Sequence, residues 1–204
     1  MSVSILDYGM GNLGSVVNMF KKLGVATQLV NHPDEIDTAE RLLLPGVGSF
    51  DHAMSLLESQ EFIEPIHRFA ESGKAMLGIC LGMQLLLNTS EEGQLAGLGL
   101  IRGGCHKFAA TAEAPDLKIP HLGWNRVTPT QNNPIFAQLT EENRFYFAHS
   151  YYVVPEENNQ VLATSHYGLE FASMINADNI YGAQYHPEKS HRFGMQILKA
   201  FASL

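Results

Sequence analysis

Short apolar runs alternate with amphipathic segments of helical length between residues 2 and 87. The apolar runs predict buried strands, at residues 2–8, 25–30, 41–44 and 75–79. Apolar positions at helical spacing predict helices, at residues 15–23, 50–57, 62–71 and 81–87. Strands and helices that alternate in this way predict a mostly parallel sheet with helices on both faces.

Beyond residue 95 the pattern changes to apolar runs at short intervals. These predict strands, at residues 118–119, 126–128, 144–148, 151–154, 161–165, 171–175 and 181–185. An amphipathic helix is predicted at residues 192–202, and no repeat or linker interrupts the chain. We therefore expect a single domain, residues 1–204, with an α/β fold: a mostly parallel central sheet flanked by helices, with additional antiparallel strands. Its functional loops should follow the carboxyl ends of the parallel strands.

Composition narrows the class of protein. The 204 residues are 45% hydrophobic and 17% charged, which is typical of a globular domain with a full core. The formal net charge of −8 is opposite to that of a nucleic-acid binder. No apolar stretch is long enough to span a membrane, and the first residues do not resemble a secretory signal. Cys80 and Cys105 are too few for a disulfide framework, so we expect reduced thiols and a cytoplasmic location.

A glycine-rich loop follows the first predicted strand. Gly9, Gly11 and Gly14 fit the G-x-G-x-x-G fingerprint of dinucleotide-binding proteins, and Asp34 lies near the position of that motif's acidic residue. However, Asp7 would place a carboxylate against an incoming pyrophosphate. A tight turn that needs glycine dihedral angles is therefore the favoured interpretation, and a dinucleotide-binding module remains the alternative.

The strongest chemical signal is Gly78-Ile79-Cys80-Leu81-Gly82, a G-x-C-x-G sequence between an apolar strand and a helix. Such an elbow needs small residues two positions either side of the nucleophile, because the turn is sharp. The helix N-terminus favours the thiolate, and the backbone N–H of Leu81 can stabilise an oxyanion. A lone cysteine is otherwise more often a buried apolar residue, but the flanking glycines favour a nucleophile here.

A thiol nucleophile needs a base, and His186 in the sequence His186-Pro187-Glu188 is the best candidate. Pro187 keeps His186 out of helical dihedral angles, and along extended backbone Glu188 points to the same side as His186. These residues predict a Cys-His-Glu triad. His149 is the rival base but has no acidic neighbour, and Cys105 is interpreted as structural.

Two further features complete this site prediction. The loop Pro45-Gly46-Val47-Gly48 follows a parallel strand, so it should lie beside the elbow and can supply a second oxyanion donor; a plain turn is the alternative. No cysteine or histidine spacing typical of a metal site occurs, so no metal is expected. We expect no other cofactor either.

Several segments resemble those of a known family. The sequences LPGVGSF, GICLGMQLL and YHPEKS, in this order, resemble the class I (triad) glutamine amidotransferases over essentially the whole chain. The sequences ILDYGMGNLGSV, IPHLGWN and FYFAHSYY narrow the resemblance to the glutaminase subunits of imidazole glycerol phosphate synthases, which act in histidine biosynthesis. The resemblance implies an amidotransferase fold with flavodoxin-like layering.

The resemblance also implies a role for individual residues. Cys80 attacks the side-chain amide of glutamine to form a glutamyl thioester. His186, held by Glu188, protonates the departing ammonia and then activates water. Backbone amides of Val47 and Leu81 form the oxyanion hole; many amidotransferases have a third glycine where Val47 stands.

For the substrate, the resemblance implies that Gln84 and the backbone of Ser150 and Tyr151 hold the amino-acid end of glutamine. It also implies a heterodimer with a cyclase subunit, a (β/α)8 barrel that uses the ammonia to make imidazole glycerol phosphate and AICAR. We expect Asn12 and Trp124 at the docking face, with Trp124 as a core residue being the alternative.

Cysteine hydrolases are the remaining alternatives. In an α/β-hydrolase the acid precedes the histidine by a long stretch, whereas Glu188 follows His186 by two residues. Proteases of the amidotransferase-like fold lack the His-Pro-Glu element.

Overall fold

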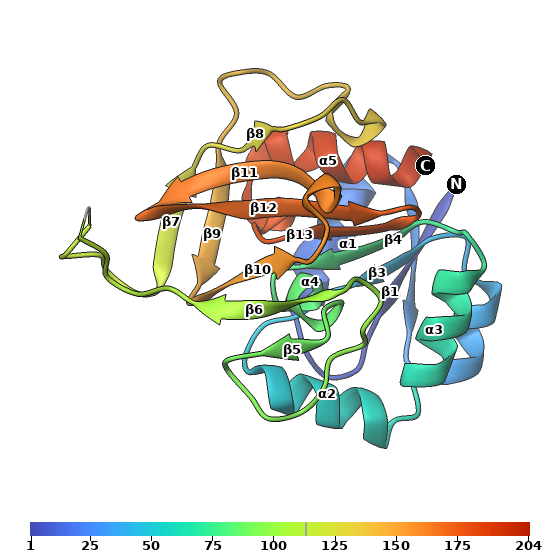
Figure 1. Cartoon of the computed structure of the whole chain (residues 1–204). Coiled ribbons are helices and arrows are strands. Elements are labelled where there is room, and N and C mark those ends of the chain that lie inside the picture. The colour runs from blue at the N-terminus through green and yellow to red at the C-terminus, as the bar shows by residue number, and fades with distance from the viewer. Residues whose placement is uncertain (113) are drawn as a thin grey trace.

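The computed structural model describes residues 1–112 and 114–204 (Figure 1). The helices are α1 (Leu13–Leu23), α2 (Phe50–Ser59), α3 (Ile63–Glu71), α4 (Leu81–Leu85) and α5 (His191–Ser203). The strands are β1 (Ser2–Leu6), β2 (Ala26–Val30), β3 (Leu42–Leu44), β4 (Met76–Ile79), β5 (Thr89–Ser90), β6 (Gly103–Lys107), β7 (His121–Asn125), β8 (Thr128–Pro129), β9 (Phe145–His149), β10 (Tyr151–Pro155), β11 (Val161–Tyr167), β12 (Leu169–Ala177) and β13 (Ile180–Ala183).

The main sheet is parallel in its first half and mostly antiparallel in its second, where β5 and β6 pair in parallel. The strands β2, β1, β3, β4 and β13 pair in this order, each parallel to its neighbour. Strand β12 then pairs antiparallel with β13, and β10, β6 and β5 follow. Strands β7 and β9 form a separate antiparallel pair. The order β2-β1-β3-β4 is that of flavodoxin-like sheets, in which sites lie at the carboxyl ends of the strands.

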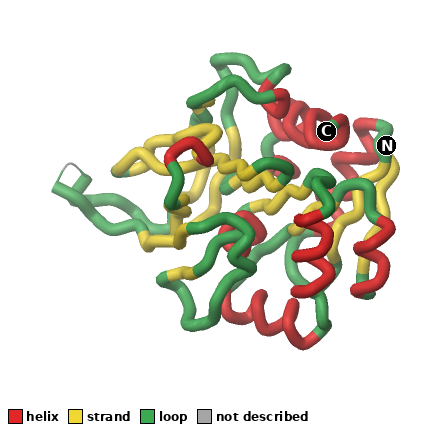
Figure 2. The backbone as a smooth tube through the Cα atoms, turned by 45° about the vertical axis from the view of Figure 1, so that its right-hand side comes forward, coloured by secondary structure: helices red, strands yellow, loops and turns green. Residues whose placement is uncertain are grey.

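Helices cover both faces of the sheet (Figure 2). Val16, Met19 and Phe20 on α1 are buried and recur at helical spacing, so one stripe of α1 faces the sheet. The same core cluster contains Ile197 and Phe201 of α5, whereas buried residues of α2 and α3 belong to the cluster on the other face. The sheet is therefore enclosed between α1 with α5 and α2 with α3.

The predicted fold class is confirmed: the sheet is mostly parallel in the first half of the chain, is flanked by helices and carries antiparallel strands. The strand predicted at residues 118–119 is wrong, because the chain becomes a strand only at His121. The strand predicted at 126–128 is shorter and later, at Thr128–Pro129. Strands β5 and β6 were not predicted; β6 begins with two glycines and depends on pairing with distant β10.

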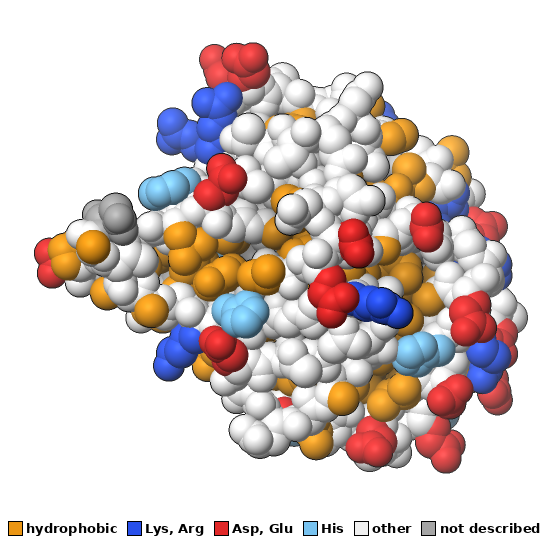
Figure 3. Space-filling model, viewed as in Figure 1, with side chains coloured by type: hydrophobic (Ala, Val, Ile, Leu, Met, Phe, Trp, Pro, Cys, Tyr) orange, Lys and Arg blue, Asp and Glu red, His pale blue; other side chains and the backbone are white. Residues whose placement is uncertain are grey.

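Charge is unevenly spread over the surface. Acidic side chains gather over α2 and α3 on the face that Figure 3 shows, whereas the basic ones at its upper left lie beside acidic ones. Within the described ranges, no helix has the length and apolar character needed to cross a membrane.

Candidate active site

Cys80 occupies a sharp turn between β4 and α4. Its dihedral angles, φ 54° and ψ −108°, lie in a region that non-glycine residues rarely adopt. The neighbouring glycines are required by close approaches: a Cβ on Gly82 would lie 2.0 Å from the carbonyl oxygen of Leu44, and one on Gly78 2.5 Å from that of Gly82. The local backbone therefore has the strained elbow that the sequence predicts.

His186 and Glu188 meet at the end of β13. His186 Nδ1 lies 2.8 Å from Glu188 Oε1, and both side chains are only 3% exposed. The predicted geometry was wrong in one respect, since Glu188 lies in a 3-10 turn, Pro187–Lys189, instead of extended backbone. His186 is held by its backbone N–H, which donates to the carbonyl oxygen of Tyr146, and by its carbonyl oxygen, which accepts from Ser190 Oγ.

The second ring nitrogen of His186 is left for Cys80. Burial by itself lowers the pKa of His186, but hydrogen bonds to Cys80 and Glu188, together with their negative charges, outweigh burial and raise it to about 10. The arrangement therefore keeps His186 protonated at neutral pH, with its positive charge beside the Cys80 sulfur, as a reactive Cys-His pair requires.

A cavity of about 410 Å³ opens in front of the thiol. It brings together most of the predicted site residues: Val47, Cys80, Leu81, Gln84, Ser150, Tyr151 and His186. Glu188 is absent from the lining and reaches the cavity only through His186. The chemistry-bearing side chains thus share one pocket at the carboxyl end of β4.

The predicted oxyanion loop lies against the elbow. A Cβ on Gly46 would approach the backbone nitrogen of Gly82 to 2.8 Å, and the buried Tyr8 hydroxyl donates to the carbonyl oxygen of Pro45 at 2.9 Å. Val47 is exposed and lines the cavity. Loop and elbow therefore face the same space, as two oxyanion donors require.

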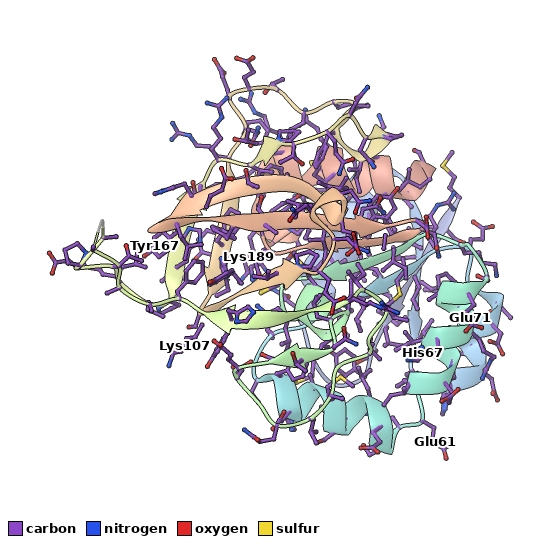
Figure 4. The ribbon with its side chains drawn as sticks, viewed as in Figure 1. Glu61, His67, Glu71, Lys107, Tyr167 and Lys189 are labelled. Carbon is purple, nitrogen blue, oxygen red and sulfur yellow. The ribbon has the colours of Figure 1, made fainter. Side chains whose placement is uncertain are left out.

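Two charged residues of the cavity were missed by the sequence analysis. Glu92 accepts a hydrogen bond from the backbone N–H of Phe50, and burial raises the pKa of its carboxyl. Lys189 lies with its Nζ 5.7 Å from the centre of the Tyr146 ring and is labelled in Figure 4. Lys189 belongs to the recognised YHPEKS segment and could have been found there, whereas nothing in the local sequence distinguishes Glu92.

Gln84 donates both of its amide hydrogens to other groups of the protein. Its Nε2 donates to the carbonyl oxygen of Tyr151 at 3.1 Å and to Gln184 Oε1 at 3.2 Å. Only Oε1 of Gln84 is therefore available to a ligand, and an oxygen acceptor suits an ammonium group.

His149, the rival base, and Cys105, the second cysteine, are both buried, and burial shifts the pKa of each so that the uncharged form is favoured. Burial lowers the pKa of His149 to about 3, and its Nδ1 donates to the carbonyl oxygen of Tyr151 at 2.8 Å. Burial raises the pKa of Cys105 to about 12. A neutral histidine with committed nitrogens and a protonated thiol are structural groups here.

The glycine loop at the front of the chain serves a turn. Gly9 and Gly11 have φ of 91° and 103°, and a Cβ on Gly11 would lie 2.9 Å from Pro45 Cβ. Gly14 already lies within α1, with no described residue within 4 Å of an added Cβ. This loop packs on the oxyanion loop, so the dinucleotide-binding alternative is not favoured.

Asn12 and Trp124 lie outside the cavity lining. Asn12 caps α1, its Oδ1 accepting from the backbone N–H of Ser15 at 3.3 Å. Trp124 is 48% exposed and stacks on His191, with ring centres 5.4 Å apart. The alternative that Trp124 is a core residue is therefore wrong. Among the described residues no cluster of three or more metal-ligating side chains occurs.

Known proteins share this fold and sequence. A family model described as glutamine amidotransferase class-I matches residues 4–203. One similar structure is that of PurLQS from Thermotoga maritima, with a TM-score of 0.76 and 20% identity over 99% of this chain and 97% of that one. Another, described as a glutamine amidotransferase, has a TM-score of 0.72 and 16% identity over 99% of both chains. The chain belongs to the class I glutamine amidotransferases.

Within that class, nearer relatives cover nearly the whole chain. Imidazole glycerol phosphate synthase subunit HisH 2 of Methanococcus maripaludis is 47% identical over 98% of both chains. The HisH subunit of Moorella thermoacetica is 45% identical over 99% of this chain and 94% of its own. The chain therefore falls in the family of these HisH subunits.

Proposed function

We propose that this protein is the glutaminase subunit of an imidazole glycerol phosphate synthase, which hydrolyses glutamine to glutamate and ammonia in histidine biosynthesis. The observation that carries the proposal is the buried His186–Glu188 pair beside the elbow cysteine, in a chain 47% identical to a HisH subunit. The cysteine hydrolases and the dinucleotide-binding module are not favoured.

The first half of the proposed reaction forms a thioester. The Cys80 thiolate attacks the side-chain amide carbon of glutamine, and its electron pair forms the new C–S bond. Backbone N–H groups of Val47 and Leu81 face the developing oxyanion. When the C–N bond breaks, the His186 imidazolium gives its proton to the leaving nitrogen, which departs as ammonia. The raised pKa of His186 keeps this proton available at neutral pH.

The second half returns the enzyme to its starting state. Neutral His186 takes a proton from water as the water oxygen attacks the thioester carbon. The C–S bond then breaks, glutamate leaves, and the thiolate faces the imidazolium again. Glu188 holds the ring by its Nδ1 throughout.

The charges in the cavity suit a free amino acid. Glu92 and the free Oε1 of Gln84 can receive an α-ammonium group, and Lys189 can receive an α-carboxylate. The backbone of Ser150 and Tyr151 lines the same space. A substrate with one charge of each sign and a short side chain is what this lining recognises.

A partner protein is part of the proposal. Ammonia released into water would be protonated and lost, so its consumer should dock over the cavity; we propose a cyclase subunit, a (β/α)8 barrel. Leu122 and Trp124 are exposed apolar residues on one face of β7, where Trp124 stacks on His191, and Asn12 caps α1. An exposed aromatic anchor beside polar groups is typical of interface hot spots.

The experiment for the reaction measures glutamate and ammonia release from glutamine, with and without a cyclase subunit and its nucleotide substrate. We expect release from glutamine and none from asparagine, with Cys80→Ala inactive. An active Cys80→Ala variant would refute the proposed nucleophile, and absence of release under every condition would refute the function.

The experiment for the partner uses Trp124, the only tryptophan in the chain. Its fluorescence should shift when the cyclase subunit is added, and Trp124→Ala should weaken binding at least tenfold, about 1.4 kcal/mol, without unfolding. The matched control is Val154→Ala on β10, also an exposed apolar residue. An unchanged spectrum together with unchanged affinity would place the interface elsewhere.

A further inference from the structure

Four buried polar side chains lie near Cys80. They are Gln84, His121, His149 and Gln184. Gln84 has a part in the proposed reaction through its contact with substrate, and the other three have none. Buried amides and imidazoles are stable only when their hydrogen bonds are made. In this protein the two histidines bond to each other and the two glutamines bond to each other. His149 and Gln84 both bond to the carbonyl oxygen of Tyr151, so the hydrogen bonds run without a break from β7 to the sulfur of Cys80.

The inner part of the chain consists of the two glutamines. Gln84 Nε2 donates to the carbonyl oxygen of Tyr151 at 3.1 Å and to Gln184 Oε1 at 3.2 Å. Gln184 Nε2 in turn lies 3.9 Å from Cys80 Sγ, within donating reach of a sulfur acceptor. Gln184 is fully buried at the end of β13, two residues before His186.

The outer part of the chain consists of the two histidines. His149 Nδ1 lies 2.8 Å from the carbonyl oxygen of Tyr151, and His149 Nε2 lies 2.9 Å from His121 Nδ1. Asn125 Nδ2 lies 3.3 Å from His121 Nε2 and also donates to the carbonyl oxygen of His166 at 2.8 Å. His121 is stacked on Tyr167, with ring centres 4.0 Å apart, and Figure 4 labels Tyr167 on the β7 side of the molecule.

The carbonyl oxygen of Tyr151 fixes which group donates and which group accepts in each of these hydrogen bonds. A carbonyl oxygen only accepts, so His149 Nδ1 and Gln84 Nε2 must both carry the hydrogens that face it. His149 Nε2 is then an acceptor, and His121 must donate from Nδ1 and accept at Nε2. Burial lowers the pKa of His121 to about 4 and of His149 to about 3, so each ring carries the single hydrogen that this pattern needs.

The same logic fixes the amide that faces the nucleophile. Because Gln84 donates to Gln184 Oε1, the Nε2 group of Gln184 is the one that points to sulfur. Besides Gln184 and the His186 ring, Cys80 Sγ lies near the carbonyl oxygen of Ala148, at 3.9 Å. A carbonyl accepts only from the protonated thiol, whereas an amide N–H stabilises the anion.

We propose that Gln184 is a positioning residue that donates a hydrogen bond to the Cys80 thiolate, and that the chain running from Asn125 to Gln84 holds its amide in the donating orientation. The proposal rests on the proposed function only in taking Cys80 as the nucleophile. Gln184 does not touch substrate; it favours the reactive form of sulfur and fixes where the sulfur lies.

The first test measures thiol reactivity without any substrate. Gln184→Met keeps the length of the side chain and removes both N–H groups. We expect the rate of Cys80 alkylation by iodoacetamide at pH 7 to fall about tenfold, with the midpoint of its pH profile about one unit higher. Buried Cys105, followed by mass spectrometry in the same sample, reports whether the fold has loosened.

An unchanged alkylation rate and midpoint in Gln184→Met would overturn the proposal. If that variant unfolds, Gln84→Met leaves Gln184 in place but removes the group that orients it, and should lower the rate at least threefold. This assay needs no glutaminase activity. A protein that alkylates as expected but releases no glutamate would refute the proposed function and leave the role of Gln184 standing.

The second test asks whether the outer chain acts through Gln184. His149→Phe keeps a ring among Phe108, Phe147 and Phe171 but loses the donor to Tyr151. We expect a threefold or larger drop in alkylation rate, and almost no further drop when His149→Phe is added to Gln184→Met.

The control for this test is His106→Phe, which removes a histidine outside the chain. Its effect should be small and should multiply with that of Gln184→Met. If the two effects of His149→Phe and Gln184→Met also multiply as independent factors, the outer chain does not act through Gln184 and that part of the proposal is wrong.

Discussion

Replacing Glu188 by glutamine removes one charge from the proposed triad and changes little else. Glu188 Oε1 lies 2.8 Å from His186 Nδ1, and a glutamine oxygen can accept from the same N–H. The ring should therefore keep its place, and the KM for glutamine should stay within about threefold of the original value because no substrate contact is lost. The expected loss is in turnover.

The size of the expected loss in turnover follows from the burial of His186 and Glu188. Both side chains are 3% exposed, so the imidazolium that protonates the leaving nitrogen would lie without this counter-charge in a site that water barely reaches. Removing one partner of a buried ion pair costs about 3–5 kcal/mol. If this appears in the barrier, kcat falls by a factor of about 200 to 5,000.

The new amide also affects stability. Glu188 Oε2 is buried and, among the described residues, has no hydrogen-bond partner. The Nε2 group of a glutamine would occupy that place, and leaving its hydrogens unpaired lowers the free energy of unfolding by about 1–3 kcal/mol. Steady-state glutaminase kinetics and urea unfolding measure the two effects separately.

Glu91→Gln is the matched control. Glu91 Oε1 lies 3.1 Å from His106 Nδ1, the same kind of pair, but the two side chains are 53% and 47% exposed. We expect no change in kcat and little change in the free energy of unfolding, because an exposed ion pair is screened by water. Turnover of Glu188→Gln equal to that of the original protein would refute the catalytic role of Glu188.

The effect of Glu188 on stability should depend on pH. The folded pKa of His186 is raised to about 10 from 6.5, so the pair's contribution is fully present below pH 6.5 and is lost as pH rises through about 10. The gap in unfolding free energy between the original protein and Glu188→Gln should therefore narrow from pH 6 to pH 10. A gap that widens over this range would contradict the assignment.

Two predictions concern the elbow. Cys80→Ala and Cys80→Gly should both lack glutaminase activity. In thermal unfolding Cys80→Gly should be the more stable variant by about 1 kcal/mol, because glycine relieves the strain at φ 54°. Equal or reversed stabilities would show that the turn is unstrained. Gly82→Ala should lose activity and at least about 3 kcal/mol of stability, because its Cβ would lie 2.0 Å from the carbonyl oxygen of Leu44. The control variant Gly14→Ala should retain full activity and unfold at the same or a higher temperature, because no described residue lies within 4 Å of its added Cβ. A fully stable, active Gly82→Ala variant would refute the close packing of the elbow.

The sequence was most informative where structure depends on neighbours along the chain. The elbow at Cys80 was predictable because small residues two positions either side permit a sharp strand-to-helix turn. The His186–Glu188 pair was predictable for a similar reason, although the backbone between them forms a 3-10 turn instead of a strand. The parallel half of the sheet followed from apolar runs that alternate with amphipathic helices.

Long-range pairing decided the rest. Strand β6 contains Gly103 and Gly104 and has little strand propensity of its own, so it exists because β10 supplies its partner backbone. Trp124 is exposed because β7 pairs with β9 outside the main sheet, a pairing that the local pattern does not reveal.

The polar chain behind the nucleophile shows the difference most clearly. Gln84 and Gln184 lie 100 residues apart in sequence. Each is a polar residue beside an apolar run, and neither local sequence indicates that the two side chains bond to each other. The sequence by itself predicted the elbow at Cys80, the His186–Glu188 pair and the strands that carry them, because steric limits and periodicity act over a few residues. Only the tertiary structure decided which buried donors meet which acceptors, because a hydrogen bond depends on distance and direction in space and leaves no periodic mark in the sequence.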